Sequence, residues 1–350
     1  MKKLTSILSI VALSASVTIL SVEAHSAKKL RVLGLPISTG LIQKEKEQPF
    51  FEDFAAKTGI DKFTIQYTPI DATGIKPEDT LRVLRNGTYD IVAIRAAQAA
   101  QDDPFLLGLD IVGLSTDYAK ARKVYAAYKD AFDVRLQAKS NAKLLGLWPF
   151  GPQIIFSKDK LTGLSDLKGK KVRVYDQSLA KFMESLGAIP VNVRFPEVQQ
   201  ALSRGVVDVA ITGASSANSA GWPEVTKYMM PLGFQVSYNG YAINLKVWNS
   251  LSEQEQSALQ EAFDKLNASI WEYSEYLSDD AFRCNTGKTP CETVKQYQLK
   301  EIPVTEADLK IVAEGVKNIS FPTWSKTCNS TWPQCKDKWL ELLGEISGIK

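Results

Sequence analysis

One nine-residue pattern occurs twice in this chain, and each copy joins the end of a predicted helix to a predicted strand. The copies are LRNGTYDIV at 84–92 and LSRGVVDVA at 202–210, which share Leu, Gly and Asp at the same spacing. A helix that ends on glycine, followed by an aspartate and an apolar run, is typical of a tight turn into a buried parallel strand. The repeat therefore predicts two similar α/β units with a cleft between them.

The residues that follow the two copies are the first candidates for a binding site. Ligands of parallel sheets lie at the carboxyl ends of the strands. Arg95 follows the first predicted strand, and Thr212 with Gly213 follows the second. Because Arg95 ends an otherwise apolar run, it lies either at the rim of the site or inside it as a second anchor for the ligand.

The length of the chain favours two domains. Its 350 residues, 45% of them hydrophobic, are enough for two cores. The order of predicted strands and helices places 28–148 and 237–277 in a first α/β domain. Residues 149–236 and 278–350 form the second, which includes a C-terminal extension with the cysteines. The chain then crosses between the domains twice, and the two crossings form a hinge.

A long helix is predicted after the second crossing. Ser252 is a helix N-cap, and Glu255 three residues later completes a capping box. The helical pattern continues to about Arg283, which gives a helix long enough to brace both domains. The alternative is two shorter helices that meet near Ser269.

The amino terminus indicates export. Residues 1–24 begin with Lys2 and Lys3, continue with an apolar stretch, and end in a small-residue site at Ala24. This is the layout of a secretory signal peptide, with cleavage expected after Ala24. The alternative is an uncleaved membrane anchor, although serines and threonines interrupt the apolar stretch.

Charge and histidine content exclude several classes of function. The formal net charge is +3, and without a basic stripe or a nucleic-acid module there is no case for a nucleic-acid partner. His25, the only histidine, lies at the expected cleavage point. Catalysis by Ser-His-Asp or Cys-His and metal sites built on histidine are therefore not expected. Enzymes that use two carboxylates remain open, but no motif marks such a pair.

The four cysteines form two evenly spaced local pairs in an apparently exported chain. Cys284 is seven residues before Cys291, and Cys328 is seven residues before Cys335. We predict two local disulfides, although four cysteines allow three pairings. A zinc site is the competing interpretation, but six-residue spacers are longer than those of zinc motifs and no histidine accompanies them.

Three motifs in the second half identify a family resemblance. They are LSDLKGKKVRV at 164–174, FPEVQQAL at 195–202 and GVVD at 205–208. Together they resemble the solute-binding proteins of tripartite ATP-independent periplasmic (TRAP) transporters, of the dicarboxylate-binding (DctP) type. The resemblance covers essentially the whole chain after the signal peptide. It implies a type II-like periplasmic-binding-protein fold, a periplasmic location, no cofactor or metal, and no enzymatic activity. Such proteins capture a small organic acid in the cleft and deliver it to a membrane permease.

The resemblance also assigns ligand contacts. Arg173 matches the arginine that makes a two-point contact with the ligand carboxylate, and Gln153 matches a second polar contact. Phe195 matches the aromatic that packs on the ligand, while Thr212 departs from the asparagine usual at its position. Several members have a second arginine where this chain has Gln153, so the amide favours a monocarboxylate. An aromatic or branched carboxylate or a 2-oxo acid fits the aromatic residues near the cleft.

Arg173 is also a candidate from its chemistry alone. The guanidinium is a planar fork of donors that matches a carboxylate. The alternative is an arginine on the solvated face of an edge strand, because Lys171, Arg173 and Tyr175 alternate with valines.

Further candidates lie in three segments. Phe150 belongs to the aromatic and proline-rich stretch 148–153, which is either a rigid hinge or an aromatic wall over the ligand. Asn218 and Trp222 belong to a predicted loop of small polar residues after a strand. Thr39 and Gln43 lie beyond the first predicted strand, on the other lip of the cleft.

Two other functions stay open from the sequence. One is a secreted hydrolase that depends on two carboxylates. The other is a binding protein that serves an ATP-driven importer or a sensor kinase. The TRAP-type solute-binding protein is expected to be a monomer.

Overall fold

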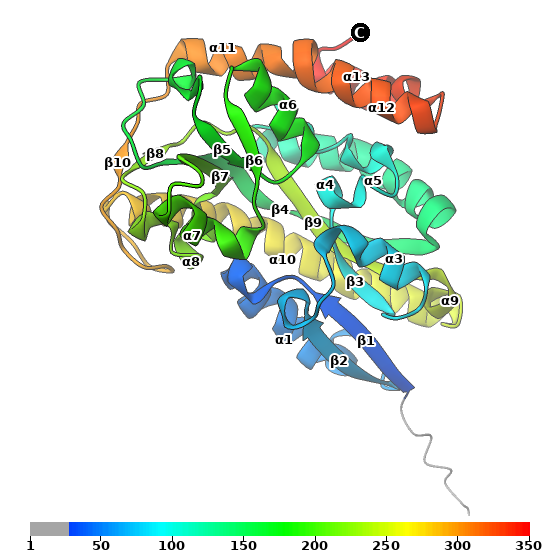
Figure 1. Cartoon of the computed structure of the whole chain (residues 1–350). Coiled ribbons are helices and arrows are strands. Elements are labelled where there is room, and N and C mark those ends of the chain that lie inside the picture. Colours follow the sequence, from blue (N-terminus) through cyan, green and yellow to red (C-terminus); the bar gives the residue numbers. More distant parts are fainter. Residues whose placement is uncertain (1–27) are drawn as a thin grey trace, which may run out of the picture.

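Strand β4 (Ala142–Ser157) connects the two halves of the molecule. In this computed structural model, which describes residues 28–350, the strands lie in the order β2-β1-β3-β9-β4-β7-β5-β6 (Figure 1). Residues 142–152 of β4 pair with β9 (Val236–Asn244), and residues 153–157 pair with β7 (Val209–Gly213). The predicted signal peptide at 1–24 lies outside the described residues.

Each half contains its own group of parallel strands. The first half is built on β1 (Lys28–Gly34), β2 (Phe63–Pro69) and β3 (Ile91–Arg95). The second half is built on β5 (Lys171–Val174), β6 (Ile189–Asn192) and β7. Strand β8 (Tyr228–Met230) pairs with β4, and β10 (Lys300–Glu301) pairs with β8. The predicted α/β fold with two similar units is confirmed.

The two copies of the repeated pattern have the same local structure. Gly87 and Gly205 end helices α3 (Thr80–Arg85) and α7 (Val198–Ser203) with φ angles of 70° and 71°. Each copy's aspartate then accepts a hydrogen bond from a backbone amide of the neighbouring parallel strand. Asp90 accepts from Arg31 N at 2.8 Å, and Asp208 accepts from Lys171 N at 2.9 Å. The aspartates therefore cap strand amides that the sheet ladder leaves free.

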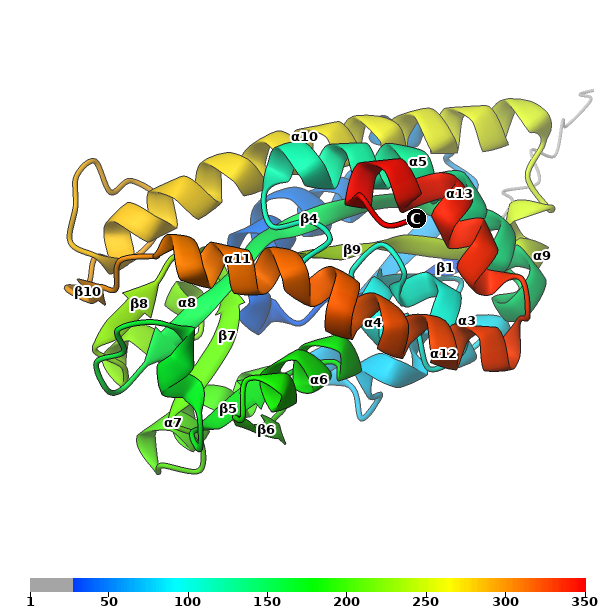
Figure 2. The same cartoon turned by 90° about the horizontal axis from the view of Figure 1, so that it is seen from above.

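Helix α10 (Glu253–Asn285) is a single helix of 33 residues. The Ser252–Glu255 capping box is present, and the alternative of two helices meeting near Ser269 is wrong. At about 1.5 Å per residue the helix is about 50 Å long. Figure 2 shows that it runs along the molecule from one half to the other, and it packs against β4 and α8 (Ala214–Ser219). The prediction that it braces both halves is thus supported by its contacts.

The remaining helices cover the sheet or connect its strands. Helix α5 (Tyr118–Ser140) packs on β4. The others are α1 (Gln48–Glu52), α2 (Phe54–Thr58), α4 (Ala96–Ala99), α6 (Gln177–Ser185), α9 (Leu245–Trp248), α11 (Glu306–Gly315), α12 (Phe321–Thr331) and α13 (Cys335–Ser347). Among residues 28–350, no helix is both long and apolar enough to span a bilayer.

Both cysteine pairs are local disulfides. Cys284 is bonded to Cys291 and Cys328 to Cys335, as predicted, so the zinc interpretation is wrong. The second bond joins α12 to α13.

The C-terminal helices contact the first half as well as the second. Trp324 Nε1 donates to Pro104 O at 2.8 Å, and Trp339 Nε1 donates to Gly108 O at 2.7 Å. Both carbonyls precede α5, whose side chains share a core with Trp339. The division into 28–148 with 237–277 and 149–236 with 278–350 stays a prediction, and α12 and α13 tie the end of the chain to the first part.

Candidate functional site

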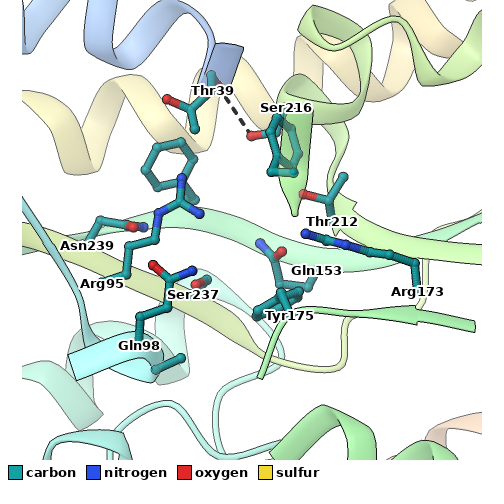
Figure 3. Close-up of a pocket in the computed structure, with 13 residues that line it drawn as sticks. Thr39, Arg95, Gln98, Gln153, Arg173, Tyr175, Thr212, Ser216, Ser237 and Asn239 are labelled. Carbon is teal, nitrogen blue, oxygen red and sulfur yellow. Dashed lines mark hydrogen bonds between the residues drawn. The ribbon is translucent and has the colours of Figure 1, made fainter. Parts of the chain in front are cut away.

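A pocket lies where the two halves meet, beside β4 and β9 (Figure 3). Its lining comprises Thr39, Arg95, Ala97, Gln98, Phe150, Gln153, Arg173, Tyr175, Phe195, Thr212, Ser216, Ser237 and Asn239. It continues into a wider cleft of about 1110 Å³, with which it shares Arg95, Arg173 and Phe195. Ser216 Oγ donates to Thr39 O at 3.5 Å, so the two halves touch at one side of the pocket.

The strand ends bring the lining residues together. Arg95 is the last residue of β3, and Thr212 and Gly213 are the last two of β7, as expected for ligands at carboxyl ends. Gly213 is needed for close packing, because a Cβ there would lie 2.9 Å from Phe150 O. The extended stretch around Phe150 belongs to β4 itself, so it both crosses between the halves and lines the pocket.

Two backbone carbonyls hold the Arg173 side chain in the pocket. Its Nε donates to Val193 O at 3.1 Å and its Nη1 to Ile211 O at 3.0 Å, which leaves Nη2 for a ligand. The residue is 3% exposed, and β5 lies between β6 and β7, so the alternative of a solvated edge-strand arginine is wrong.

The buried charge of Arg173 has no carboxylate of the described residues in direct contact, and the nearby Asp176 favours it less than Arg95 opposes it. Burial lowers its pKa to about 10, which still leaves the guanidinium charged at neutral pH. Among the described residues no carboxylate oxygen lies within 4.0 Å of it; instead it lies 5.4, 5.9 and 5.6 Å from the ring centres of Tyr175, Phe195 and Trp222. Aromatic faces stabilise a cation but leave its hydrogen-bonding edge open. This arrangement is suited to binding an anion.

Arg95 lines the opposite side of the pocket (Figure 3). Burial lowers its pKa to about 10, and the carboxyl group of Glu47 opposes that shift. The two guanidinium groups repel each other across the pocket, because Arg95 further lowers the pKa of Arg173. Arg95 lines both the pocket and the wider cleft, and whether it is a rim residue or a second anchor for the ligand stays a prediction.

The structure places seven of the ten predicted residues in the pocket lining: Thr39, Arg95, Phe150, Gln153, Arg173, Phe195 and Thr212. Phe195 is supported from behind by Trp222, whose ring centre is 5.5 Å away. Gln153 Nε2 donates to Gly151 O at 2.9 Å, which fixes its amide. Their contacts with a ligand stay a prediction.

Three predicted residues do not line the pocket. Trp222 is fully buried beneath Phe195. Asn218 Nδ2 donates to Asn285 Oδ1 at 2.6 Å and to Lys295 O at 2.7 Å, and Gln43 Nε2 donates to Tyr67 Oη at 3.0 Å. The predicted loop around Asn218 is in fact helix α8. Because residues two apart in a helix face different directions, Ser216 faces the pocket and Asn218 faces α10.

Sequence reasoning missed several lining residues, chiefly Tyr175, Gln98, Ser216, Ser237 and Asn239. Tyr175 lies two residues after Arg173, just beyond the end of β5, so the alternation already noted could have found it. Ser237 and Asn239 alternate in the same way along β9. Their position became interpretable only once β9 was seen between β3 and β4.

Two α/β halves around a pocket with a buried, uncompensated arginine define a solute-binding protein of the periplasmic type. A family model supports this class: residues 43–300 match DctP, the bacterial extracellular solute-binding protein family 7. The chain belongs to this family, and the predicted resemblance to TRAP solute-binding proteins is confirmed. Members of the family are solute-binding receptors, periplasmic in location, and not a family of enzymes.

Curated relatives are distant. The C4-dicarboxylate-binding periplasmic protein DctP of Rhodobacter capsulatus is 27% identical over 227 residues, which is 63% of this chain and 66% of that protein. The sialic acid-binding periplasmic protein SiaP of Vibrio cholerae is 24% identical over 71% of this chain and 84% of its own length. With DctP, the alignment thus spans just under two thirds of the relative.

Solved structures share the fold. A Bordetella pertussis extracytoplasmic solute receptor binding pyroglutamic acid is 21% identical, with a TM-score of 0.75 over 89% of this chain and 99% of the receptor. A TRAP periplasmic solute-binding protein from Desulfovibrio salexigens with bound orotic acid is 19% identical, with a TM-score of 0.77 over 91% of this chain and 99% of that protein. At these identities the likeness is one of fold.

Proposed function

We propose that this protein captures a small organic monocarboxylate between its two halves and delivers it to a TRAP-type membrane permease. The single observation that carries the proposal is Arg173, a buried cation with no acidic partner among the described residues and an open edge toward the pocket. A carboxylate there forms charge-assisted hydrogen bonds, each contributing about 1.5 to 3 kcal/mol.

The aromatic residues define the rest of the ligand. Phe150, Tyr175 and Phe195 line the pocket and offer apolar surface to the carbon skeleton. An aromatic, branched or 2-oxo carboxylate fits this lining.

Capture works through closure of the two halves. Thr39 and Arg95 come from the first half, whereas Arg173 and Thr212 come from the second, so a ligand that contacts both is held best when they are together. Only such a difference in affinity shifts the balance between open and closed forms. In this proposal β4, β9 and α10 form the hinge, and the protein acts as an exported, periplasmic monomer.

The lining disfavours the hydrolase. Within the described residues the inner pocket around Arg173 is lined by no aspartate or glutamate, and a two-carboxylate mechanism needs a pair of them. The carboxyl groups of the wider cleft, which belong to Asp71, Glu78, Asp176 and Glu197, do not line this inner pocket.

The experiment is a thermal-unfolding screen of the mature protein against small acids, sugars and amino acids, with mass spectrometry of the denatured protein to identify any acid that co-purifies. A ligand at a hundredfold excess over its dissociation constant adds about 2.7 kcal/mol of stability, which is a shift of a few degrees. Stabilisation by carboxylates that is lost in Arg173→Ala supports the proposal. No response to any acid, and no co-purified acid, would contradict it.

A further inference from the structure

The Arg95 side of the pocket is built on one rung of the sheet. Arg95 on β3 is paired with Asn239 on β9, and Asn239 is also paired with Trp148 on β4. Paired residues share a face of the sheet, so the three side chains lie side by side. Tyr241 is two residues after Asn239 and therefore lies on the same face.

Glu47 lies behind this rung and outside the pocket lining. It is fully buried, and its Oε2 accepts a hydrogen bond from Tyr241 Oη at 3.0 Å. Its Oε1 has no hydrogen-bond partner among the described residues. No ion pair within 4.0 Å joins Glu47 to Arg95, but Arg95 is the positive charge that favours the ionised form of Glu47, and Glu47 is the carboxyl group that favours the charged form of Arg95. We therefore treat Glu47 as the buried counter-charge of that arginine.

The two arginines of the pocket therefore differ in charge balance. For Arg95, Glu47 is the largest influence that opposes desolvation. For Arg173, the attraction of Asp176 is smaller than the repulsion from Arg95, and the side chain is held by two backbone carbonyls and aromatic rings. A buried charge is tolerated only when it is compensated. The pocket therefore needs one negative charge from its ligand, at the Arg173 end.

The polar groups beside Arg95 favour a neutral ligand group at the Arg95 end of the pocket. Asn239 is 2% exposed, and its Oδ1, like Oε1 of Gln98, has no hydrogen-bond partner among residues 28–350. Both side chains line the pocket next to Arg95 (Figure 3). A carboxylate would satisfy Arg95 but repel these oxygens, because it can only accept hydrogen bonds. An amide or hydroxyl accepts from Arg95 and donates to them.

We propose that Glu47, by balancing Arg95, restricts the ligand to a monoanion whose carboxylate binds Arg173 and whose far end is a neutral group that both donates and accepts hydrogen bonds, such as an amide. This inference rests on the proposed function, because it assumes that a carboxylate binds Arg173. Glu47 is a positioning residue that acts through Arg95.

Matched ligand pairs test the far end directly. Succinamate and glutaramate differ from succinate and glutarate only in having an amide in place of one terminal carboxylate. Calorimetry at pH 8, where the half-amides are monoanions and the dicarboxylates are dianions, measures the affinity of each. Each half-amide should bind the wild-type protein at least about tenfold more tightly than its dicarboxylate, a difference of about 1.4 kcal/mol.

Glu47→Gln tests whether the charge of Glu47 causes the preference for the half-amide. The substitution keeps the shape and an acceptor for Tyr241 but removes the charge, so the preference for the half-amide should shrink by about tenfold or reverse. In an Arg95→Gln background the same substitution should leave the ratio unchanged, because Glu47 acts through Arg95. Thermal unfolding of each variant shows whether it is folded. A general loss of binding-competent protein lowers both affinities equally, so it leaves the ratio of half-amide to dicarboxylate affinity unchanged.

The pH dependence supplies an independent measurement. Burial raises the pKa of Glu47 to about 7, and the groups facing it are Arg95, Tyr241, Trp148 and Tyr67. Lowering the pH from 8 to 6.5 protonates Glu47, so dicarboxylates should gain on half-amides in the wild type. The gain should be absent in Glu47→Gln, although Asp110 and Asp176, whose pKa values burial also raises, are present in both proteins.

Three results would overturn the inference while leaving the proposed function intact. The first is tighter binding of the dicarboxylates by the wild type, and the second is an affinity ratio that Glu47→Gln does not change. Binding of some other carboxylate through Arg173 with no measurable binding of either half-amide would likewise reject the neutral far end. Failure of every acid to bind would instead reject the proposed function and the inference together.

Discussion

The two copies of the repeated unit share a backbone but differ in the charges they carry. In the first half the unit ends directly on Arg95, which is balanced by buried Glu47. In the second half the unit ends on Thr212 and Gly213, and the arginine is on the neighbouring strand β5 without an acidic partner. Equivalent turns and strands thus place two arginines on opposite walls of one pocket. The wall with Arg173 is suited to binding an anion, whereas on the other wall the charge of Arg95 is balanced by Glu47.

The largest effect is expected from Arg173→Ala. Loss of the charge-assisted contact proposed between Arg173 Nη2 and the ligand should weaken carboxylate binding by about 100-fold or more. Arg173→Lys keeps the charge but not the fork and should recover only part of the affinity. Calorimetry measures both variants.

Arg122→Ala is the matched control for Arg173→Ala. Arg122 is an exposed arginine of α5 that pairs with Glu275, and it does not line the pocket. Equal losses of carboxylate affinity in the two variants would show that Arg173 does not bind the ligand, and the proposed difference between the two walls would then be wrong.

Glu47→Gln should change stability in a pH-dependent way. Burial raises the pKa of Glu47 from 4.5 to about 7, so the folded protein favours the protonated acid. The cost of ionising it appears as the pH rises from about 4.5 to 7 and is complete above that, on the order of 3 kcal/mol. The variant, which avoids this cost, should unfold a few degrees higher than the wild type at pH 8 and show no such gain at pH 5. A difference in unfolding temperature that does not vary with pH would show that Glu47 stays ionised.

The aspartates of the repeat offer a direct comparison of the two halves. Asp90 accepts from Arg31 N and also binds the Arg31 guanidinium, with Nε at 2.9 Å, whereas Asp208 accepts only the Lys171 amide. Asp90→Ala should cost about 2 kcal/mol of unfolding free energy and Asp208→Ala about 1 kcal/mol. Urea unfolding measures both. A larger loss from Asp208→Ala would reverse the ranking of the two caps.

The smallest effect on binding is expected from residues that support the pocket from outside. Asn218→Ala in the second half and Gln43→Ala in the first remove hydrogen bonds to Asn285 and Tyr67, so each should lower stability by about 1 kcal/mol. Affinity should stay within about threefold of wild type, since neither residue lines the pocket. A tenfold loss of affinity in either variant would extend the site beyond the lining residues.

Local patterns in the sequence determined much of this protein. The repeated Leu-Gly-Asp spacing, the Ser252–Glu255 capping box and the pairing of Cys284 with Cys291 each depend on residues a few positions apart. Such short-range features have one favourable geometry and can be predicted without knowing the rest of the chain. Arg173 was predictable for a different reason, because a family motif surrounds it.

The tertiary structure alone decided which side chains meet. Insertion of β9 between β3 and β4 brings Asn239 beside Arg95, and the phase of α8 turns Ser216 toward the pocket and Asn218 away from it. Glu47 is an ordinary acidic residue in the sequence and becomes the counter-charge of Arg95 only through burial beside Tyr241. These contacts join residues far apart in the chain, so they depend on strand order, helix phase and desolvation, which no local pattern specifies.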